Sequence, residues 1–169
     1  MTDWTVRGLQ IKTQADRPVV YSPEERRRRD QTGWTLVQGI LAPVQFVVFL
    51  VSLILVVRYL LTGEGLEWAG WSVVVKTGVL LLIMVTGAIW EKVVFGQYLF
   101  ARPFFWEDVV SMLVIALHLA VAVAWFDWGL QLDADSAMAL ALVAYAAYLI
   151  NAAQFLRKLR LARLEVRHA

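Results

Sequence analysis

Four long apolar blocks constrain the fold of this chain more than any other feature of its sequence. They cover residues 34–61, 71–95, 107–126 and 136–156, and each is near the roughly 20 residues that a helix needs to cross a bilayer core. The composition agrees, because 60% of the 169 residues are hydrophobic and 18% are charged, where a soluble domain has about 25% charged residues. We therefore expect an all-α polytopic membrane protein with four transmembrane helices.

The charges outside these blocks predict how the helices are oriented. Arginine and lysine lie before residue 34, in the connector 96–106 and after residue 156, whereas the loops 62–70 and 127–135 carry only acidic charges. Segments rich in positive charge stay on the cytoplasmic side of a membrane. Both termini and the connector are therefore expected to be cytoplasmic.

The same pattern divides the chain into three parts. We expect residues 1–33 to form a cytoplasmic amino-terminal tail, residues 34–156 the four-helix transmembrane domain, and residues 157–169 a basic cytoplasmic tail. The net charge of +2 is too small to indicate nucleic acid as a partner.

Several function classes are disfavoured by what the sequence lacks. It has no cysteine, which removes disulfide scaffolds, thiolate metal sites and thiol nucleophiles. It contains no phosphate-binding glycine loop, dinucleotide fingerprint or HExxH pair, and its two histidines, His118 and His168, are too few for a di-haem site. Two function classes remain: acid-base chemistry by carboxylates, and binding without a chemical step.

Polar side chains inside the apolar blocks gather toward the expected cytoplasmic half. On the first block, Gln38 and Gln45 lie seven residues apart and share one helix face. On the second block, Glu91 lies just inside the cytoplasmic end, and Lys76 near the other end is expected to extend its ammonium group to the headgroups. Polar groups kept inside a membrane usually face a bundle interior or a wet cavity, where they bind or react.

The third and fourth blocks carry polar stripes of their own. Offsets of four, seven and eleven residues return to nearly the same angle on a helix, so one stripe of the third block holds a carboxylate, a hydroxyl and an imidazole. Its members are Glu107, Ser111, Val114 and His118, and Asp108 adjoins the first of them. Steps of three residues on the fourth block align Tyr148, Asn151 and Gln154.

Each of these residues has a structural alternative. The amides, which are Gln38, Gln45, Asn151 and Gln154, belong to a type that commonly forms hydrogen bonds between helices. His118 is alternatively a packed core histidine, and the carboxylates Glu91, Glu107 and Asp108 are alternatively solvated charges at span ends.

The connector 96–106 is rich in aromatic residues and lies beside the polar cluster. Its side chains include Tyr98, Arg102 and Trp106. Such aromatic side chains either lie in the headgroup layer or stack on a large planar ring. We interpret the connector as the lip of a site for a flat ligand.

Five strings in the chain resemble the 2-vinyl bacteriochlorophyllide hydratase family. They are YSPEERRRRD at 21–30, WTLVQGILAPVQF at 34–46, WEKVVFGQYLFA at 90–101, FWED at 105–108 and YLINAAQF at 148–155. The resemblance covers nearly the whole chain after about residue 20. It implies that water adds across the ring A 3-vinyl group of a chlorophyllide or bacteriochlorophyllide, giving a 1-hydroxyethyl group in bacteriochlorophyll synthesis.

The implied reaction needs no redox cofactor, because the only metal is the magnesium of the substrate macrocycle. It also implies a phototrophic bacterium, so we expect a multi-pass protein of the inner membrane, cytoplasmic or intracytoplasmic. Its partners would be the pigment substrate and membrane lipid, with neighbouring pathway enzymes or a second copy of the chain as further candidates.

Hydration of a vinyl group needs an acid to protonate its terminal carbon and a base to activate water. We hypothesise that Glu91 is the acid and that Glu107 or Asp108 orients the water. The expected substrate-binding residues are Gln38, Gln45, Tyr98, Arg102, Trp106, His118, Asn151 and Gln154. His118 is the candidate axial ligand of the substrate magnesium, although magnesium also accepts water.

Two rival functions are compatible with the same residues. A non-catalytic pigment-binding or assembly protein would hold a chlorophyll precursor without changing it. A small transporter or channel subunit would carry polar groups through both leaflets, whereas here they gather at one end.

Overall fold

The computed structural model describes the backbone of residues 20–167 and the side chains of residues 20–164. It contains a short helix, α1 (Pro23–Gln31), followed by four long helices. These are α2 (Gly33–Thr62), α3 (Leu66–Phe95), α4 (Phe105–Trp125) and α5 (Ala134–Arg167). No strand occurs between residues 20 and 167. His168 lies outside the described residues.

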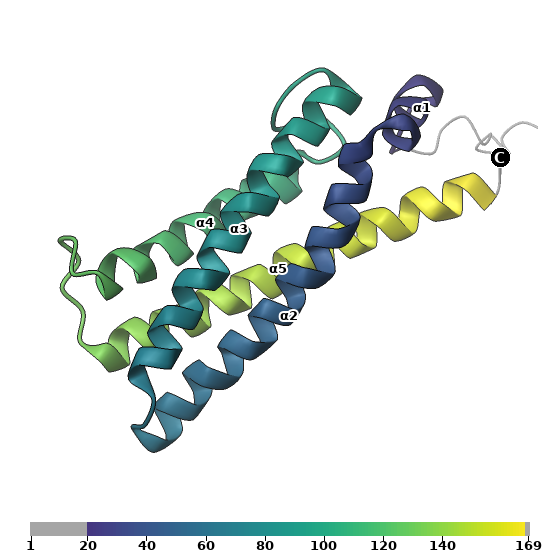
Figure 1. The fold of residues 1–169 in the computed structure, drawn as a ribbon. Helices are drawn as coiled ribbons and strands as arrows, with labels where there is room; N and C mark the ends of the chain where they lie inside the picture. The colour runs from purple at the N-terminus through teal and green to yellow at the C-terminus, as the bar shows by residue number, and fades with distance from the viewer. Residues whose placement is uncertain (1–19, 168–169) are drawn as a thin grey trace, which may run out of the picture.

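The four long helices are each long and apolar enough to cross a membrane. The expectation of an all-helical chain with four such helices is therefore confirmed. Helix α2 packs chiefly against α3, and α4 packs chiefly against α5. Figure 1 shows α1, the α3–α4 connector and the outer part of α5 toward one end of the bundle, with the other two loops at the opposite end.

Three boundaries differ from those expected. Helix α3 begins at Leu66, because Gly63 and Gly65, with φ of 73° and 82°, reverse the chain in a very short turn. Helix α5 continues without a break to Arg167, through most of the expected basic tail. The expected amino-terminal tail contains α1, whose Ser22 and Glu25 form a reciprocal capping box with Pro23 in the first turn.

The apolar core has two parts. The larger part runs along the inside of the bundle and includes Phe49, Val73, Val114 and Tyr145. The smaller part lies beside the connector, where Phe104 packs against rings that include Phe95 at 5.8 Å and Phe155 at 6.1 Å between centroids. The second part ties the connector to α3 and α5.

The polar face of α2 forms a seam of hydrogen bonds with its neighbours. Gln38 Nε2 donates to Thr86 Oγ1 of α3 at 2.8 Å, and Tyr59 Oη donates to Asp135 Oδ1 of α5 at 2.8 Å. Between them, the Ser52 hydroxyl contacts the hydroxyls of Ser72 at 2.7 Å and Tyr145 at 2.5 Å. The alternative of an interhelical role is thus confirmed for Gln38.

The expected position of the Lys76 ammonium group is wrong. Lys76 is completely buried, and its Nζ lies 4.0 Å from the centre of the Tyr148 ring. The residue lies on the face of α3 that also buries Val73 and Leu80, so its side chain points into the bundle and not toward the headgroups.

A close approach of α3 and α4 depends on a glycine. At Gly70 a Cβ atom would overlap the indole ring of Trp125, whereas at Gly78 of the same helix a Cβ would meet no atom within 4 Å. The indole therefore occupies the space that a side chain at residue 70 would need.

We predict that Gly70→Ala lowers the unfolding free energy by about 1–3 kcal/mol, the usual cost of overpacking. Thermal unfolding in detergent measures it. Gly78→Ala is the matched control and should leave stability unchanged or raise it by up to about 1 kcal/mol, because it removes only the entropy cost of glycine in a helix. Equal effects of the two substitutions would contradict the packing described here.

Candidate functional site

Two buried carboxyl groups meet where the connector joins α3 to α4. Glu91 lies near the end of α3 and Asp108 in the first turn of α4. Both side chains are buried, with 5% and 3% of their area exposed. Because α3 and α4 are antiparallel neighbours, the end of α3 lies beside the start of α4. The two residues are therefore at the same level of the bundle.

The connector donates one backbone amide to each carboxyl group. Phe100 N–H donates to Asp108 Oδ2 at 2.7 Å, and Ala101 N–H donates to Glu91 Oε2 at 3.2 Å. Phe100 has a φ of 60°, in the left-handed region that most residues avoid. This backbone turn is what aims two successive N–H groups at the carboxyl pair.

Glu107 lies beside the pair but has different partners. Its Oε1 forms an ion pair with Lys158 Nζ of α5 at 3.2 Å. Lys158 Nζ also donates to the carbonyl of Pro103 in the connector. Lys158 therefore connects α5 both to the start of α4 and to the connector.

Asn151 holds α5 against α4 just inside this level. Its Nδ2 donates to the carbonyl of Glu107 at 2.9 Å, and its Oδ1 accepts from Ser111 Oγ at 3.1 Å. The expected stripe on α4 is confirmed, since Glu107, Ser111, Val114 and His118 are all buried. The side-chain amide of Asn151 is already bonded through both of its polar atoms, as its structural alternative requires.

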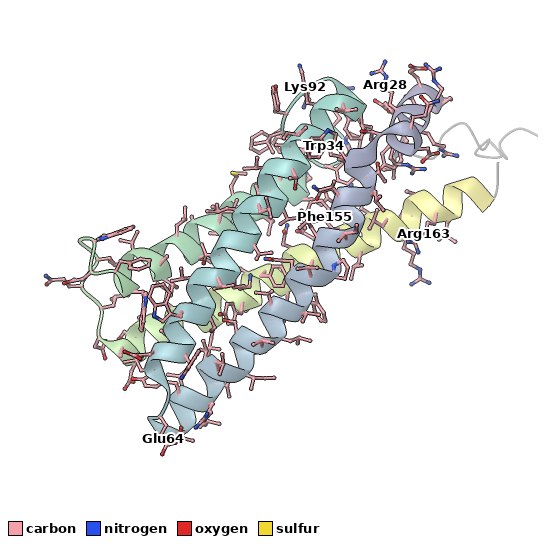
Figure 2. The ribbon with its side chains drawn as sticks, viewed as in Figure 1. Arg28, Trp34, Glu64, Lys92, Phe155 and Arg163 are labelled. Atoms are coloured by element: carbon pink, nitrogen blue, oxygen red, sulfur yellow. The ribbon has the colours of Figure 1, made fainter. Side chains whose placement is uncertain are left out.

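Three predicted binding residues lie on the surface of the connector region. Tyr98 and Trp106 have 60% and 70% of their area exposed, and Arg102 is exposed as well. The Lys92 ammonium lies 5.4 Å from the Tyr98 ring centre. Figure 2 places Lys92 at the same end of the bundle as Trp34 and Arg28, with Glu64 at the far end. Tyr98 and Trp106 are therefore surface residues of the connector region, whereas Glu91 and Asp108 are buried.

The predicted glutamines separate by position. Gln38 is bonded to Thr86 on the seam, away from the carboxyl pair. Gln45 is buried inside the bundle, and neither polar atom of its side chain has a hydrogen-bond partner within the described residues. Gln154 is partly buried, and its Oε1 likewise has no partner there.

His118 lies deeper in the bundle than the carboxyl pair. Ten residues separate it from Asp108 along α4, a rise of about 15 Å. The ring is completely buried, and its Nδ1 is 2.7 Å from the carbonyl oxygen of Val114. A carbonyl only accepts, so Nδ1 carries the proton and Nε2 keeps its lone pair. That Nε2 has no partner in the described part of the chain.

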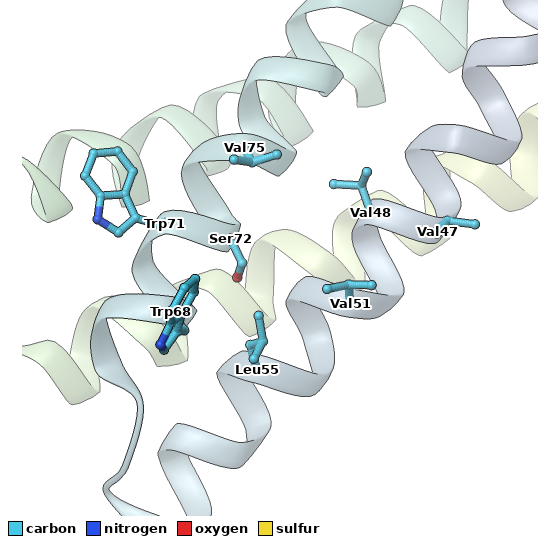
Figure 3. Close-up of a pocket in the computed structure, with 8 residues that line it drawn as sticks. All are labelled: Val47, Val48, Val51, Leu55, Trp68, Trp71, Ser72 and Val75. Carbon is cyan, nitrogen blue, oxygen red and sulfur yellow. The ribbon is translucent and has the colours of Figure 1, made fainter.

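A shallow groove of about 310 Å³ lies elsewhere, between α2 and α3. Figure 3 shows Trp68, Trp71 and Ser72 on one side of it, with valines and Leu55 around them. Its lining contains none of the predicted site residues. The groove therefore offers an apolar surface and no acid or base.

Sequence reasoning missed the contribution of Lys158 and of the connector amides. Lys158 follows Asn151 by seven residues, so the spacing that aligned Tyr148 and Asn151 could have indicated it. The amides of Phe100 and Ala101 left no such signal, because their direction depends on the left-handed turn at Phe100.

Comparison with known proteins identifies close relatives. Residues 21–161 match the family model described as 2-vinyl bacteriochlorophyllide hydratase. A protein of that name from Rhodobacter capsulatus is 63% identical over 149 residues, which are 88% of this chain and 85% of that protein. Another of that name from Cereibacter sphaeroides is 61% identical over 153 residues, 89% of this chain and 92% of that protein. No solved structure matches this chain.

We predict that Asp108→Ala releases the connector, because the Phe100 amide loses its acceptor and the left-handed turn loses its support. Hydrogen exchange measured by mass spectrometry in nanodiscs should then quicken at least tenfold across residues 97–102, as expected from the loss of about 1.4 kcal/mol of local protection. Asp127→Asn, in the other loop of α4, should leave exchange in the connector unchanged. Unaltered protection in Asp108→Ala would show that the carboxylate does not hold the loop.

Proposed function

The chain belongs to the 2-vinyl bacteriochlorophyllide hydratase family, and we propose that it adds water across the ring A 3-vinyl group of chlorophyllide a or bacteriochlorophyllide. The product carries a 1-hydroxyethyl group, and the step belongs to bacteriochlorophyll biosynthesis. The observation that carries the proposal is a pair of buried carboxyl groups, bonded to successive backbone amides of the connector at one end of an apolar bundle, in a chain over 60% identical to proteins of that name.

The addition of water to a vinyl group determines which chemical groups the site must supply. A proton adds to the terminal vinyl carbon, and the cation formed at the adjacent carbon is delocalised into the conjugated macrocycle. Water then attacks that carbon and gives up one proton, so the net change is the addition of one water molecule. The enzyme needs a proton donor and a group that accepts the proton from water.

The carboxyl pair meets both requirements. Two buried carboxyl groups held by successive backbone amides repel each other when both are ionised, so a single proton on the pair is favoured. We assign that proton to Glu91, which delivers it to the vinyl group. Asp108, held by the Phe100 amide, then orients the attacking water and takes its proton. A shared proton of this kind is how acid and base roles arise from two like groups.

Glu107 is the second candidate for the residue that orients the water, but its ion pair favours a structural role. Its Oε1 is occupied by Lys158, so it serves better to keep the connector and α5 in place. Asn151, bonded through both polar atoms, supports the same arrangement. Both are therefore positioning residues in this mechanism.

The remaining binding roles follow from which polar atoms are free. Gln45 and Gln154 keep unbonded side-chain atoms that can reach a substrate, whereas Gln38 is engaged by Thr86. At the surface, Tyr98 and Trp106 offer faces for stacking, and Arg102 offers a cation for the substrate propionate.

His118 is suited to bind the substrate magnesium. A histidine that ligates a metal nearly always donates its other ring N–H to a carbonyl or carboxylate, which fixes the tautomer. His118 donates Nδ1–H to Val114 and keeps the Nε2 lone pair free. His118 lies about 15 Å deeper than Asp108 along α4, so the metal and the reacting edge would lie at different depths.

The setting of this reaction is a bacterial inner membrane, cytoplasmic or intracytoplasmic, with both termini and the connector on the cytoplasmic side. The arginines of α1 and the basic outer part of α5 support that orientation. The reaction uses no redox cofactor, and its magnesium belongs to the substrate. Membrane lipid is a partner, with a second copy of the chain or neighbouring pathway enzymes as further ones.

The direct test supplies a 3-vinyl chlorophyllide to membranes that contain this chain and no other bacteriochlorophyll enzyme. Chromatography and mass spectrometry should show a product heavier by one water, formed only with active protein. Pigment binding without that product would instead favour a carrier or assembly role.

We predict that Glu91→Gln lowers turnover by about 10²–10⁴-fold, because it removes the proton donor, and leaves pigment binding in place. Product formation and pigment binding are measured on the same membranes. Glu67→Gln, the same change at an exposed position of α3, should keep full activity. Full activity in Glu91→Gln would refute the assignment of the acid.

We predict that His118→Ala weakens pigment binding and shifts the absorption of the bound pigment, because the magnesium loses its axial nitrogen. Binding titration and absorption spectra report both effects. Added imidazole, which fits the space left by the side chain, should reverse the spectral shift. Unaltered affinity and absorption would remove His118 as the ligand.

A further inference from the structure

The middle of the bundle holds a second group of polar side chains, apart from the carboxyl pair. Gln45 of α2, Lys76 of α3 and His118 of α4 are at least 98% buried. Four of their polar atoms have no hydrogen-bond partner in the described part of the chain: both of the Gln45 amide, Lys76 Nζ and His118 Nε2. We refer to these three residues as the interior cluster.

Two tyrosines of α5 bring the cluster together. Lys76 Nζ lies 4.0 Å from the ring centre of Tyr148 and 5.6 Å from that of Tyr145. The His118 ring centroid lies 5.8 Å from that of Tyr145. On the α2 side, Phe49 contacts both tyrosines, at 5.5 and 5.0 Å, one helical turn from Gln45. Lys76 and His118 therefore approach the same aromatic ring from two helices.

Such an arrangement is costly unless something binds to it. An amine without an acceptor in a hydrocarbon interior loses its hydration and gains little in return, and a ring face replaces only part of that loss. The Lys76 side chain turns inward and is completely buried. A buried donor kept in this way indicates a ligand that supplies an oxygen acceptor.

We propose that Lys76 donates a hydrogen bond to the ketone oxygen on ring E of the macrocycle while His118 binds its magnesium, with Gln45 as a further donor at the same edge. This inference rests on the proposed function. The ketone is conjugated and coplanar with the ring, so its oxygen lies at a fixed distance from the metal. Two protein groups that share the Tyr145 ring can therefore engage both points at once.

This contact also orients the substrate. The ketone of ring E and the 3-vinyl group of ring A lie at opposite ends of the macrocycle. Holding the ketone in the interior cluster directs the vinyl edge away from it along the bundle, toward the end that carries Glu91 and Asp108. Lys76 is thus a substrate-positioning residue and takes no part in proton transfer.

The test compares the wild type with Lys76→Met, which keeps an apolar stem and removes the donors. Bound 3-vinyl chlorophyllide should show a ketone stretching band at higher wavenumber in the variant, as for a free carbonyl. The pigment Kd and the KM should rise about tenfold, equivalent to about 1.4 kcal/mol, while kcat changes little. Arg58→Met, which removes an exposed cation of α2, is the control and should leave all of these unchanged.

A substrate analogue with a methylene in place of the ketone gives an independent arm. The wild type should bind it about tenfold more weakly than the ketone form, and Lys76→Met should bind both equally. The comparison of the two pigments on the wild type does not need the variant, so it holds if Lys76→Met does not fold. The methyl ester of the propionate should behave like the free acid toward Lys76, since the propionate is not the acceptor.

The outcomes separate this inference from the proposed function. If the wild type hydrates the vinyl group but binds the ketone and methylene pigments equally, the role of Lys76 is refuted and the hydratase stands. The Kd can also rise in Lys76→Met for the free acid but not for the methyl ester of the propionate. That result would show that Lys76 donates to the carboxylate, and it would overturn the ketone contact. In the absence of pigment, Lys76→Met should be at least as heat-stable as the wild type, whereas a lower unfolding temperature would indicate a structural lysine.

Discussion

A hydrocarbon core offers no hydrogen-bond partner, and that constraint decides how these helices meet. Each polar group turned inward either finds a partner on another helix or remains unsatisfied. The Ser52 hydroxyl forms hydrogen bonds with the hydroxyls of Ser72 and Tyr145, and so joins α2, α3 and α5 at one point. Asn151 joins α5 to α4 in the same way, through the Glu107 carbonyl and the Ser111 hydroxyl. Apolar packing fills the space around these bonds, but it does not by itself select the register.

The same constraint explains why the carboxyl groups of Glu91 and Asp108 remain buried. They lie at the junction of two helices, where the connector still has backbone amides to donate, and each takes one. The same atoms therefore meet two requirements. They close the loop between α3 and α4, and they keep the two carboxyl groups together. Substitutions at either residue are therefore best interpreted from paired measurements of loop protection and turnover.

Much of this architecture was predictable because membrane helices are long and their buried faces repeat at regular intervals. The stripe through Glu107 and His118 follows from helical spacing alone, and the structure buries it. The interior position of Lys76 was not predictable in this way, since spacing placed this residue near the expected start of the span at residue 71, and the tyrosines that receive its side chain lie some 70 residues away. Nor does spacing show that Phe100 turns left-handed, because that depends on acceptors from two other elements.

The length of α5 has a mechanical consequence. At 1.5 Å per residue its 34 residues extend about 51 Å, roughly 20 Å more than a bilayer core. Helix α5 is therefore longer than a bilayer core is thick, and Lys158, in its outer part, contacts both Glu107 and Pro103. A protein that docks on the outer turns and tilts them must either break those contacts or pull the connector along. Movement of the outer turns of α5 is thereby coupled to the connector, whose amides bond to the carboxyl pair.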